Sequence, residues 1–244
     1  MTTVLKLGGS VITEKDRAET LDGAAVDRAA DAVAGAEDLI LVHGGGSFGH
    51  HHAEAHGVST TAGSHEWEAV ADVHGAMTTL NHLVLSRLHE RDVPAVPVHP
   101  LSAASRDADA TLSLPTAQVE QLVDEGFVPV LHGDVVAHEG EGVTVLSGDE
   151  IVAELAELPA IDRLGLVSTV PGVLRDDEVI PEIRAFGEVA DAVGASDATD
   201  VSGGMAGKVR SLLSAPVPAS VFGLTDLGRF LDGERPGTTV YGDD

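Results

Sequence analysis

The stretch LILVHGGGSFGH, residues 39–50, couples a short apolar run to a turn rich in glycine. Its first four residues are typical of a strand buried on both faces, and the glycines that follow end that strand. The same pattern occurs earlier, where the apolar run at residues 4–7 stops at Gly8 and Gly9. Longer segments with helical spacing separate such runs. Strands that alternate with helices predict an α/β fold with a doubly wound, mostly parallel sheet sandwiched by helices.

The same patterns predict the other helices and strands. We expect the longest helix over residues 66–91, because Val70, Val73, Met77 and Leu80 recur at helical spacing along one stripe. No linker rich in Pro, Ser or Gly divides the chain, which indicates one domain or two intimate lobes. The other expected helices cover residues 23–36, 116–125, 149–158 and 203–213; the other expected strands cover residues 95–98, 128–131, 163–168, 219–222 and 238–240, and residues 142–146 are expected to form one arm of a hairpin.

Acidic residues far outnumber basic ones. The chain has 40 Asp and Glu against 14 Lys and Arg, which gives a formal net charge of −26. Such a charge repels nucleic acid and anionic membrane surfaces, so we expect neither as a partner. The acidity is spread along the chain and 43% of residues are hydrophobic, which favours a folded protein over a disordered one. Because salt relieves self-repulsion, the charge favours a salt-rich cytoplasm, as in a halophile.

Cysteine is absent from the sequence, which excludes disulfides, thiolate nucleophiles and zinc sites with cysteine ligands. The first ten residues, MTTVLKLGGS, lack the long apolar run of a signal peptide, and no stretch reaches membrane-spanning length. We therefore expect a soluble, cytoplasmic protein.

Lysine is scarce and occurs only in or beside glycine-rich turns. The three lysines, Lys6, Lys15 and Lys208, each lie in or beside a glycine-rich turn, whereas the other eleven basic residues are arginines. A compact ammonium group next to such a turn suits the binding of phosphate. The competing interpretation is chance placement in a chain rich in glycine. The pattern favours an enzyme of phosphoryl transfer.

Two common nucleotide-binding motifs fit this sequence poorly. Residues 44–49 match G-x-G-x-x-G after a strand, but the glycine turn at residues 8–9 already follows the first strand. The turn before Lys208 does not form a P-loop, because Ser202 replaces its first glycine and Val209 replaces the Ser or Thr that binds magnesium. A Rossmann dehydrogenase and a P-loop NTPase are therefore both disfavoured.

Five segments, read together, resemble the amino acid kinase superfamily in their order and over essentially the whole chain. They are KLGGSVIT at residues 6–13, HGGGSFGH at 43–50, HGDVV at 132–136, SGD at 147–149 and DVSGGMAGKV at 200–209. Within the superfamily, His50 at the end of the second segment, together with Lys15, is similar to the pattern of isopentenyl phosphate kinases. Fosfomycin kinases have such a histidine as well.

This resemblance implies the amino acid kinase fold, with an acceptor lobe over about residues 1–159 and a nucleotide lobe over about residues 160–244. It implies transfer of a phosphoryl group from ATP to isopentenyl phosphate, which gives isopentenyl diphosphate in an alternative mevalonate route. Mg²⁺ would be carried by ATP with few direct protein ligands, so no metal-binding residue is singled out. The resemblance also implies a homodimer.

The chemistry of the residues agrees with this activity. A phosphate monoester has a second pKa of about 6 and is nucleophilic near neutral pH, so the reaction needs no general base. It needs in-line positioning and neutralisation of charge on two anions. Lysines, backbone N–H groups and one further donor meet that need.

The resemblance implies a role for each motif residue. Lys6 and Lys15 are expected to stabilise the transferring phosphoryl group, and Lys208 to hold the β- and γ-phosphates of ATP. His50 is expected to donate a hydrogen bond to the acceptor phosphate. The expected catalytic residues are Lys6, Lys15, His50 and Lys208; the expected nucleotide-binding residues are Lys6, Gly8, Gly9, Ser10, Gly46, Asp149, Gly203, Gly204 and Lys208; the expected acceptor-binding residues are Gly45, Gly49, His50, Gly148, Val73 and Met77.

The stripe on the long helix has two interpretations. Apolar residues at helical spacing usually belong to a core, but the resemblance places Val73 and Met77 at the end of a short pocket, with Val136 or Val143 across the cleft. Aromatic residues make up 3% of the chain, so such a pocket would be aliphatic. A five-carbon tail suits it.

Several features leave alternatives open. Thr169 stands where the superfamily usually has an Asp near the nucleotide, so the choice of base is not predicted. His52 and His56 are one helical turn apart, but no carboxylate motif accompanies them, which favours solvated histidines over a zinc site. The alternative functions are a kinase for fosfomycin or another small phosphonate or carboxylate, and a non-catalytic ligand-binding member. The presence of all three lysines argues against the latter.

Overall fold

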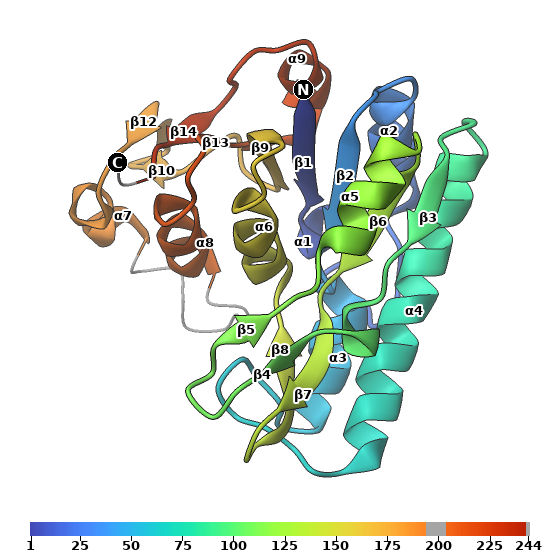
Figure 1. The fold of residues 1–244 in the computed structure, drawn as a ribbon. Coiled ribbons are helices and arrows are strands. Elements are labelled where there is room, and N and C mark those ends of the chain that lie inside the picture. Colours follow the sequence, from blue (N-terminus) through green and yellow to red (C-terminus); the bar gives the residue numbers. More distant parts are fainter. Residues whose placement is uncertain (194–203, 243–244) are drawn as a thin grey trace.

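The computed structural model describes residues 1–193 and 204–242 and shows a central sheet between two layers of helices (Figure 1). The strands of this sheet are β1 (Thr2–Leu7), β2 (Leu39–His43), β3 (Ala95–Pro97), β6 (Val128–His132), β9 (Ile161–Ser168), β12 (Glu182–Ile183), β13 (Ala219–Gly223) and β14 (Thr238–Val240). Their order is β12-β14-β13-β9-β1-β2-β6-β3. Neighbours run parallel, apart from the antiparallel pair β13 and β14.

The inner strands are buried on both faces, which explains their nearly continuous apolar sequences. On β1, Leu5 and Leu7 belong to one core cluster and Val4 to the other, as the alternation of a strand requires. The helices that contribute to the first cluster are α1 (Gly9–Ile12), α2 (Gly23–Val33), α3 (Gly46–Ala55), α4 (Trp67–His89) and α9 (Leu227–Leu231); those of the second are α5 (Ala117–Asp124), α6 (Gly148–Ala156), α7 (Ala190–Val193) and α8 (Gly204–Leu213).

A second, smaller sheet extends beyond the carboxyl ends of β1, β2 and β6 (Figure 1). The chain leaves β6 and passes through Gly133 into β7 (Asp134–His138), which pairs antiparallel with β8 (Gly142–Leu146). Helix α3 packs against α4 beside this sheet. The remaining elements are β4 (Ser105–Arg106), β5 (Leu112–Ser113), β10 (Leu174–Arg175), β11 (Glu178–Val179) and the 3₁₀ segments η1 (Pro100–Ser102), η2 (Phe186–Glu188) and η3 (Leu224–Asp226).

The predicted fold class is confirmed, and so is the hairpin arm at residues 142–146. Each predicted strand is present within two residues of its expected ends. Helix α3 was not predicted, because the glycines of residues 44–49 suggest a turn and lower helix propensity. Strand β7 was also missed, because a single glycine separates it from β6.

Helix α4 is the longest helix and matches the predicted stripe. Val73, Met77 and Leu80 are buried on it, while Val70 is partly buried against the same cluster. None of the helices in residues 1–193 and 204–242, α4 included, has the length and apolarity that crossing a bilayer requires.

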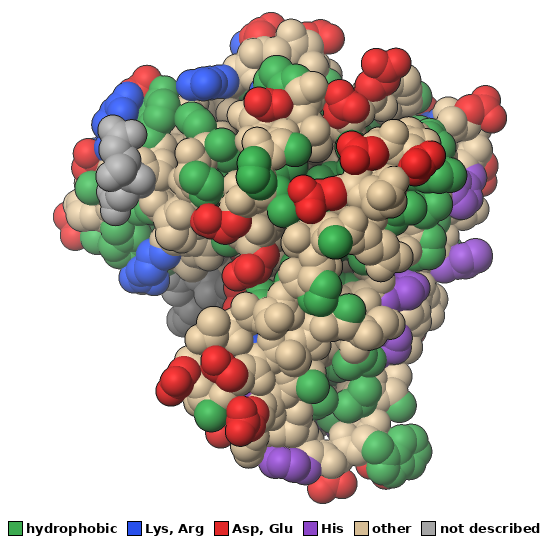
Figure 2. All heavy atoms as spheres, in the orientation of Figure 1, with side chains coloured by type: hydrophobic (Ala, Val, Ile, Leu, Met, Phe, Trp, Pro, Cys, Tyr) green, Lys and Arg blue, Asp and Glu red, His purple; other side chains and the backbone are tan. Residues whose placement is uncertain are grey.

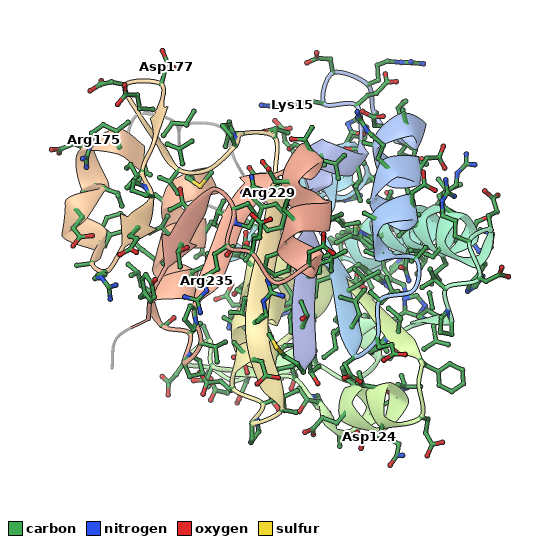
Figure 3. All side chains as sticks on the ribbon, turned by 90° about the horizontal axis from the view of Figure 1, so that it is seen from above. Lys15, Asp124, Arg175, Asp177, Arg229 and Arg235 are labelled. Carbon is green, nitrogen blue, oxygen red and sulfur yellow. The ribbon has the colours of Figure 1, made fainter. Side chains whose placement is uncertain are left out.

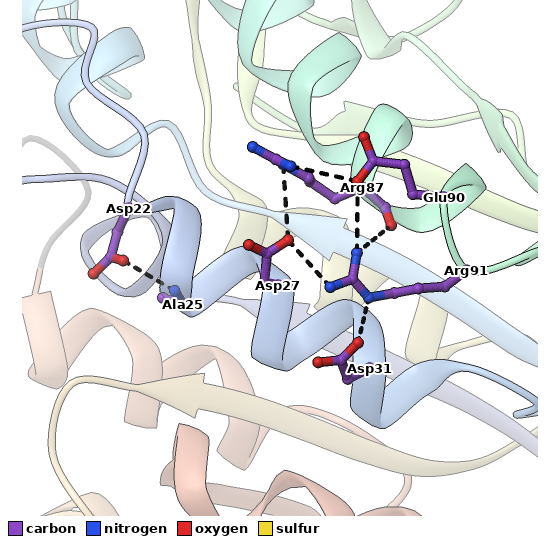
Figure 4. A network of polar contacts seen from close by, with 7 residues as sticks. All are labelled: Asp22, Ala25, Asp27, Asp31, Arg87, Glu90 and Arg91. Atoms are coloured by element: carbon purple, nitrogen blue, oxygen red, sulfur yellow. Dashed lines mark hydrogen bonds and ion pairs between the residues drawn. The ribbon is translucent and has the colours of Figure 1, made fainter.

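Arginine–carboxylate pairs join α2 to the last turn of α4 and to the residues just after it, at the surface (Figure 4). Arg91 donates from Nη2 to Oδ1 of Asp27 at 3.2 Å and from Nε to Asp31. Arg87 Nε lies 3.8 Å from the same oxygen of Asp27. A planar guanidinium can serve two carboxylates at once, which fits a surface where arginine largely replaces lysine. Figure 2 shows acidic side chains spread widely over the face in view, with few cations among them.

The first two glycine turns lie in backbone contact with each other. A Cβ atom on Gly9 would stand 2.2 Å from the backbone nitrogen of Gly46, and one on Gly44 would stand 2.6 Å from the nitrogen of Gly9. Gly46 also has a φ of +48°, a conformation that favours glycine. Because β1 and β2 end side by side in parallel register, these turns meet directly beyond the sheet.

We predict that Gly9→Ala lowers the free energy of unfolding by roughly 2 kcal/mol or more, because the added methyl group meets backbone that cannot move aside. Gly75→Ala, on the exposed side of α4, is the matched control. No described atom outside its own helix lies within 4 Å of a Cβ at Gly75, and alanine there should add about 0.5–1 kcal/mol. Chemical denaturation measures both. Parental stability in Gly9→Ala would contradict the close packing of the turns.

Candidate active site

A cavity of about 380 Å³ opens at the carboxyl ends of β1, β2 and β9, beside the glycine turns. This edge is where parallel α/β sheets bind ligands. Most of the residues predicted from the sequence meet in its wall. Those that line it are Lys6, Gly8, Gly9, Ser10, Gly45, Gly46, Gly49, His50, Val73, Met77, Gly148, Asp149, Gly204 and Lys208.

Two lysines share one buried carboxylate in this wall. Lys6 Nζ lies 2.7 Å from Oδ1 of Asp149, and Lys208 Nζ lies 3.5 Å from the same oxygen. Lys6 lies between Leu5 and Leu7 on β1, so strand alternation turns it to the opposite face, which α6 and α8 cover. Asp149 stands in the first turn of α6, and Lys208 stands on α8. Three elements distant in sequence therefore converge on one ionic group, which we call the lysine–aspartate trio.

The trio keeps Asp149 ionised. Burial alone would raise the pKa of Asp149, but the charges of Lys208 and Lys6 and the hydrogen bonds from both ammonium groups outweigh it. The pKa falls from 3.8 to about 2. With both lysines charged, the trio carries a net positive charge. This is the local potential that an anionic ligand needs in a chain of net charge −26.

A capping box fixes the start of α6. Ser147 Oγ accepts from the backbone nitrogen of Glu150 at 3.2 Å, and Glu150 Oε2 accepts from the backbone nitrogen of Ser147 at 2.8 Å. Arg106 Nη2 donates to the other oxygen of Glu150 at 2.7 Å. Gly148 leaves room for the lysine, since a Cβ there would lie 3.0 Å from Cε of Lys6. The segment SGD, residues 147–149, thus fixes the position of the Asp149 carboxylate and leaves space for Lys6 to reach it.

The second glycine turn leads directly into α3, which brings His50 into the cavity wall. Here α3 lies very close to α4. A Cβ atom on Gly49 would stand 2.8 Å from Sδ of Met77, and one on Gly45 would stand 3.3 Å from it. These glycines therefore allow His50 and Met77 to share one wall.

The aliphatic part of the wall includes Val73 and Met77, as predicted, but its partner across the cleft was predicted wrongly. Val136 is enclosed in a core cluster. Val143 is paired with the segment that precedes α4. Val145 lies further along β8, closer to the glycine turns. It lines the cavity where Val136 or Val143 was expected.

One predicted residue, Lys15, does not join this group. Lys15 lies in the exposed loop between α1 and α2 and does not line the cavity (Figure 3). Thr13 and Ser47 fasten that loop to α3, because the backbone nitrogen of Ser47 donates to Oγ1 of Thr13 at 3.0 Å. The structure therefore does not bring Lys15 to the trio. Gly203 lies outside the described residues, and its role stays a prediction.

The opposite end of the cavity is formed by the segment that follows β9 and by α7 and α8. Thr169 lies in this wall, so a hydroxyl stands where the resemblance led us to expect a carboxylate. Met205 and Val193 also line it. The surface at this end is therefore largely apolar and carries its positive charge on Lys208.

Sequence analysis included Gly133 and Asp134 in the segment HGDVV but gave them no role, and both line the cavity beside the second glycine turn. A signal was present, because His132 and Gly133 repeat the order of His43 and Gly44 after the neighbouring strand. The side chain of Asp134 is enclosed, and its Oδ2 lies 2.8 Å from Nδ1 of a histidine on α4.

The histidines near α3 are paired with separate carboxylates. His52 Nε2 lies 2.5 Å from Oε1 of Glu19, and His56 Nε2 lies 2.8 Å from Oδ2 of Asp72. Within residues 1–193 and 204–242, no three His, Asp or Glu side chains come together as a metal site requires.

Comparison with known proteins identifies the family of this chain. The sequence profile of the amino acid kinase family matches residues 1–216. The chain is 58% identical to isopentenyl phosphate kinase from Haloferax volcanii, over 98% of each chain. It is 29% identical to isopentenyl phosphate kinase from Methanocaldococcus jannaschii, again over 98% of each. An X-ray structure of isopentenyl phosphate kinase superposes with a TM-score of 0.84 at 27% identity, covering 98% of this chain and 100% of that one.

We predict that Asp149 makes the free energy of unfolding depend on pH in the acidic range. Its folded pKa lies below its unfolded value, so its contribution is present above about pH 4 and is lost as the pH falls toward 2. Asp149→Asn should lack that part of the dependence, about 1 kcal/mol, when unfolding is measured from about pH 6 to about pH 3. Asp124→Asn, exposed on α5, should keep the parental profile. A parental profile in Asp149→Asn would show that the trio does not stabilise the fold.

Proposed function

The chain belongs to the amino acid kinase family and, within it, to the isopentenyl phosphate kinases, and we propose that it transfers the γ-phosphoryl group of ATP to isopentenyl phosphate. The product is isopentenyl diphosphate. The observation that carries this proposal is a single cavity in which the lysine–aspartate trio stands beside two glycine turns and His50. Cations and backbone N–H donors arranged in this way can bind two anionic substrates side by side.

The proposed step is an in-line displacement at phosphorus. An oxygen of the acceptor phosphate forms a bond to the γ-phosphorus, and the bond from that phosphorus to the β,γ-bridging oxygen breaks. ADP leaves with the electron pair of the broken bond. The acceptor is largely a dianion at neutral pH, because its second pKa is about 6, so no side chain has to remove a proton from it.

Each member of the trio has a separate task in this proposal. Lys6, at the end of β1, stabilises the phosphoryl group as it passes between the two oxygens. Lys208, on α8, holds the β- and γ-phosphates from the nucleotide side. Asp149 contacts both ammonium groups and holds them in place before either ligand arrives. It acts as a positioning residue between the two lobes, residues about 1–159 and about 160–244.

We propose that Mg²⁺ is carried by the nucleotide, where it neutralises part of the phosphate charge. The carboxylates that the described cavity wall offers are Asp134 and Asp149. Asp149 is engaged by two lysines and Asp134 by a histidine. This arrangement leaves the ion mainly to phosphate oxygens and water, as is usual for Mg²⁺ in kinases.

The acceptor is proposed to bind between α3, α4 and β8. His50 would donate to its phosphate, and the backbone nitrogens of the second glycine turn would approach the same oxygens. Val73, Met77 and Val145 would then contact the five-carbon tail. An apolar wall fits an isoprenoid better than the polar body of an amino acid substrate.

The cellular environment, the pathway and the oligomeric state are proposed from the composition and the family. A net charge of −26 favours a salt-rich cytoplasm, and the activity would serve isoprenoid synthesis by an alternative mevalonate route. A homodimer is proposed from the family alone.

Direct assay of the product tests the proposed function. ATP consumption and product mass are measured with isopentenyl phosphate, dimethylallyl phosphate and fosfomycin, at low and at molar salt. We expect turnover of isopentenyl phosphate. Turnover of fosfomycin alone would reassign the acceptor, and binding of ATP without turnover of any acceptor would favour a non-catalytic member.

His50→Ala should lower kcat/KM for isopentenyl phosphate about a hundredfold, because a donor to a charged group is lost from a desolvated site. His50→Gln should recover much of this loss, since its amide N–H can still donate. His51→Ala, at the exposed neighbouring position, is the control. If His50→Gln were as inactive as His50→Ala, a proton-transfer role would replace the proposed donation.

Met77→Ala should lengthen the pocket and raise kcat/KM for geranyl phosphate relative to isopentenyl phosphate by about tenfold or more. Val84→Ala is the control, because Val84 is buried on the same helix but does not line the cavity. Both changes should lower thermal stability, since both remove buried apolar atoms. Lower stability without altered chain-length preference in Met77→Ala would make this stripe core instead of pocket.

A further inference from the structure

Behind the acceptor end of the cavity, four histidines and one aspartate form a connected set, which we call the histidine group. Its members are His43, His74, His99, His132 and Asp134, from β2, α4, the segment before η1, β6 and β7. Hydrogen-bonding distances, an ion pair and ring contacts link these five ionisable side chains where those elements pack. The group was not predicted from the sequence, and the proposed transfer step does not use it.

The contacts of the group run from the surface to the cavity wall. His74 Nδ1 lies 2.8 Å from Oδ2 of Asp134. His99 Nδ1 lies 2.8 Å from Nε2 of His132, and Nδ1 of His132 lies 2.9 Å from the carbonyl oxygen of Gly133. The rings of His43 and His132 stack with centroids 5.5 Å apart. Asp134 is fully enclosed, whereas the side chain of His74 is 28% exposed.

Three of the four histidines are neutral near pH 7. Burial lowers the pKa of His43 to about 4 and the pKa of His132 well below its ordinary value. Burial and the charge of His74 lower the pKa of His99. The hydrogen bond to Asp134, and then its charge, raise the pKa of His74 against the effect of its burial. His74 is therefore the member of the group whose protonated form is favoured.

The charge of Asp134 matters because of where it stands. Asp134 and Gly133 line the cavity, and a Cβ on Gly133 would lie 4.0 Å from the backbone nitrogen of Gly45 in the second glycine turn. An uncompensated carboxylate there would repel an anionic acceptor through a medium that screens it weakly. Asp134 Oδ1 accepts from the backbone nitrogen of Val135 at 2.8 Å, and its Oδ2 lies 2.8 Å from Nδ1 of His74 and 3.7 Å from Nδ1 of His132. Because burial keeps His132 neutral, His74 is the one of these partners that can supply a compensating charge.

We propose that His74 and Asp134 form a charge-balancing pair of the acceptor site: protonated His74 cancels the carboxylate, so the acceptor phosphate meets a neutral wall. This inference rests on the proposed function. Below the ordinary pKa of histidine the pair is neutral, and as the pH rises through the raised pKa of His74 the pair gains one negative charge. Acceptor binding should therefore weaken on the alkaline side. His74 is a positioning residue, since it acts on the phosphate through Asp134.

The test compares His74→Gln with the parent enzyme in steady-state kinetics at about pH 6.5 and about pH 8.5. Glutamine keeps a donor for Asp134 but cannot carry the charge. We expect the KM for isopentenyl phosphate to rise about fivefold at the lower pH, with kcat at saturation nearly unchanged. The parent should show a similar rise at the higher pH and the variant should not. His82→Gln, exposed on the same helix, controls for titration of the acceptor itself.

A double variant separates charge from structure. His74→Gln combined with Asp134→Asn leaves no charge in the pair, so its KM should return to within about twofold of the parent at about pH 6.5. If the double variant keeps the raised KM of His74→Gln, or if His74→Gln leaves KM unaltered, the pair is structural and the inference falls.

Two measurements keep this inference distinct from the proposed function. Calorimetry with inorganic phosphate repeats the comparison without turnover: weaker binding in His74→Gln, restored in the double variant, supports the pair even if isopentenyl phosphate is not a substrate. NMR titration of the His74 ring should show its pKa fall when Asp134→Asn is introduced. An unchanged titration would overturn the pairing itself.

Discussion

The site depends on one ionic contact, the sharing of Asp149 by Lys6 and Lys208. Three conditions make it possible. Strand alternation turns Lys6 away from the α2 and α4 face, the capping box of α6 fixes the carboxylate, and Gly148 leaves space for the lysine stem. Without the carboxylate, two buried ammonium groups would repel each other; without the lysines, a buried carboxylate would be costly. Each charge is therefore tolerated because the others are present.

The features that sequence could predict are those set by local chemistry. Apolar runs that end at glycines gave the strands and their order along the chain, and parallel strands bring their carboxyl ends to one edge whatever their sequence separation. Lys6 and Lys208 could be named because lysine is so rare in this chain. Their meeting at Asp149 follows from three motifs that each lie at the end of a strand or the start of a helix.

The features that sequence could not predict depend on tertiary packing. Residues 46–55 form a helix although Gly46 and Gly49 lie within it, and these glycines are needed because the helix lies so close to the first turn and to α4. The choice of Val145 over Val136 or Val143 depends on which part of a short hairpin faces the cavity. The exposed position of Lys15 depends on how its loop is tied to α3. None of these has a period or a motif that would reveal it.

Placement of charge within the cavity follows from burial. His43 and His132 end neighbouring strands in register, and each lies within hydrogen-bonding distance of the carbonyl oxygen of the glycine that follows it. A neutral imidazole has one N–H to donate, so these rings can hold the two turns without adding charge behind them. Burial enforces that neutrality by lowering the pKa of both rings. The net positive charge of the wall is thereby concentrated at the lysine–aspartate trio, where the transferred phosphoryl group would carry the most negative charge.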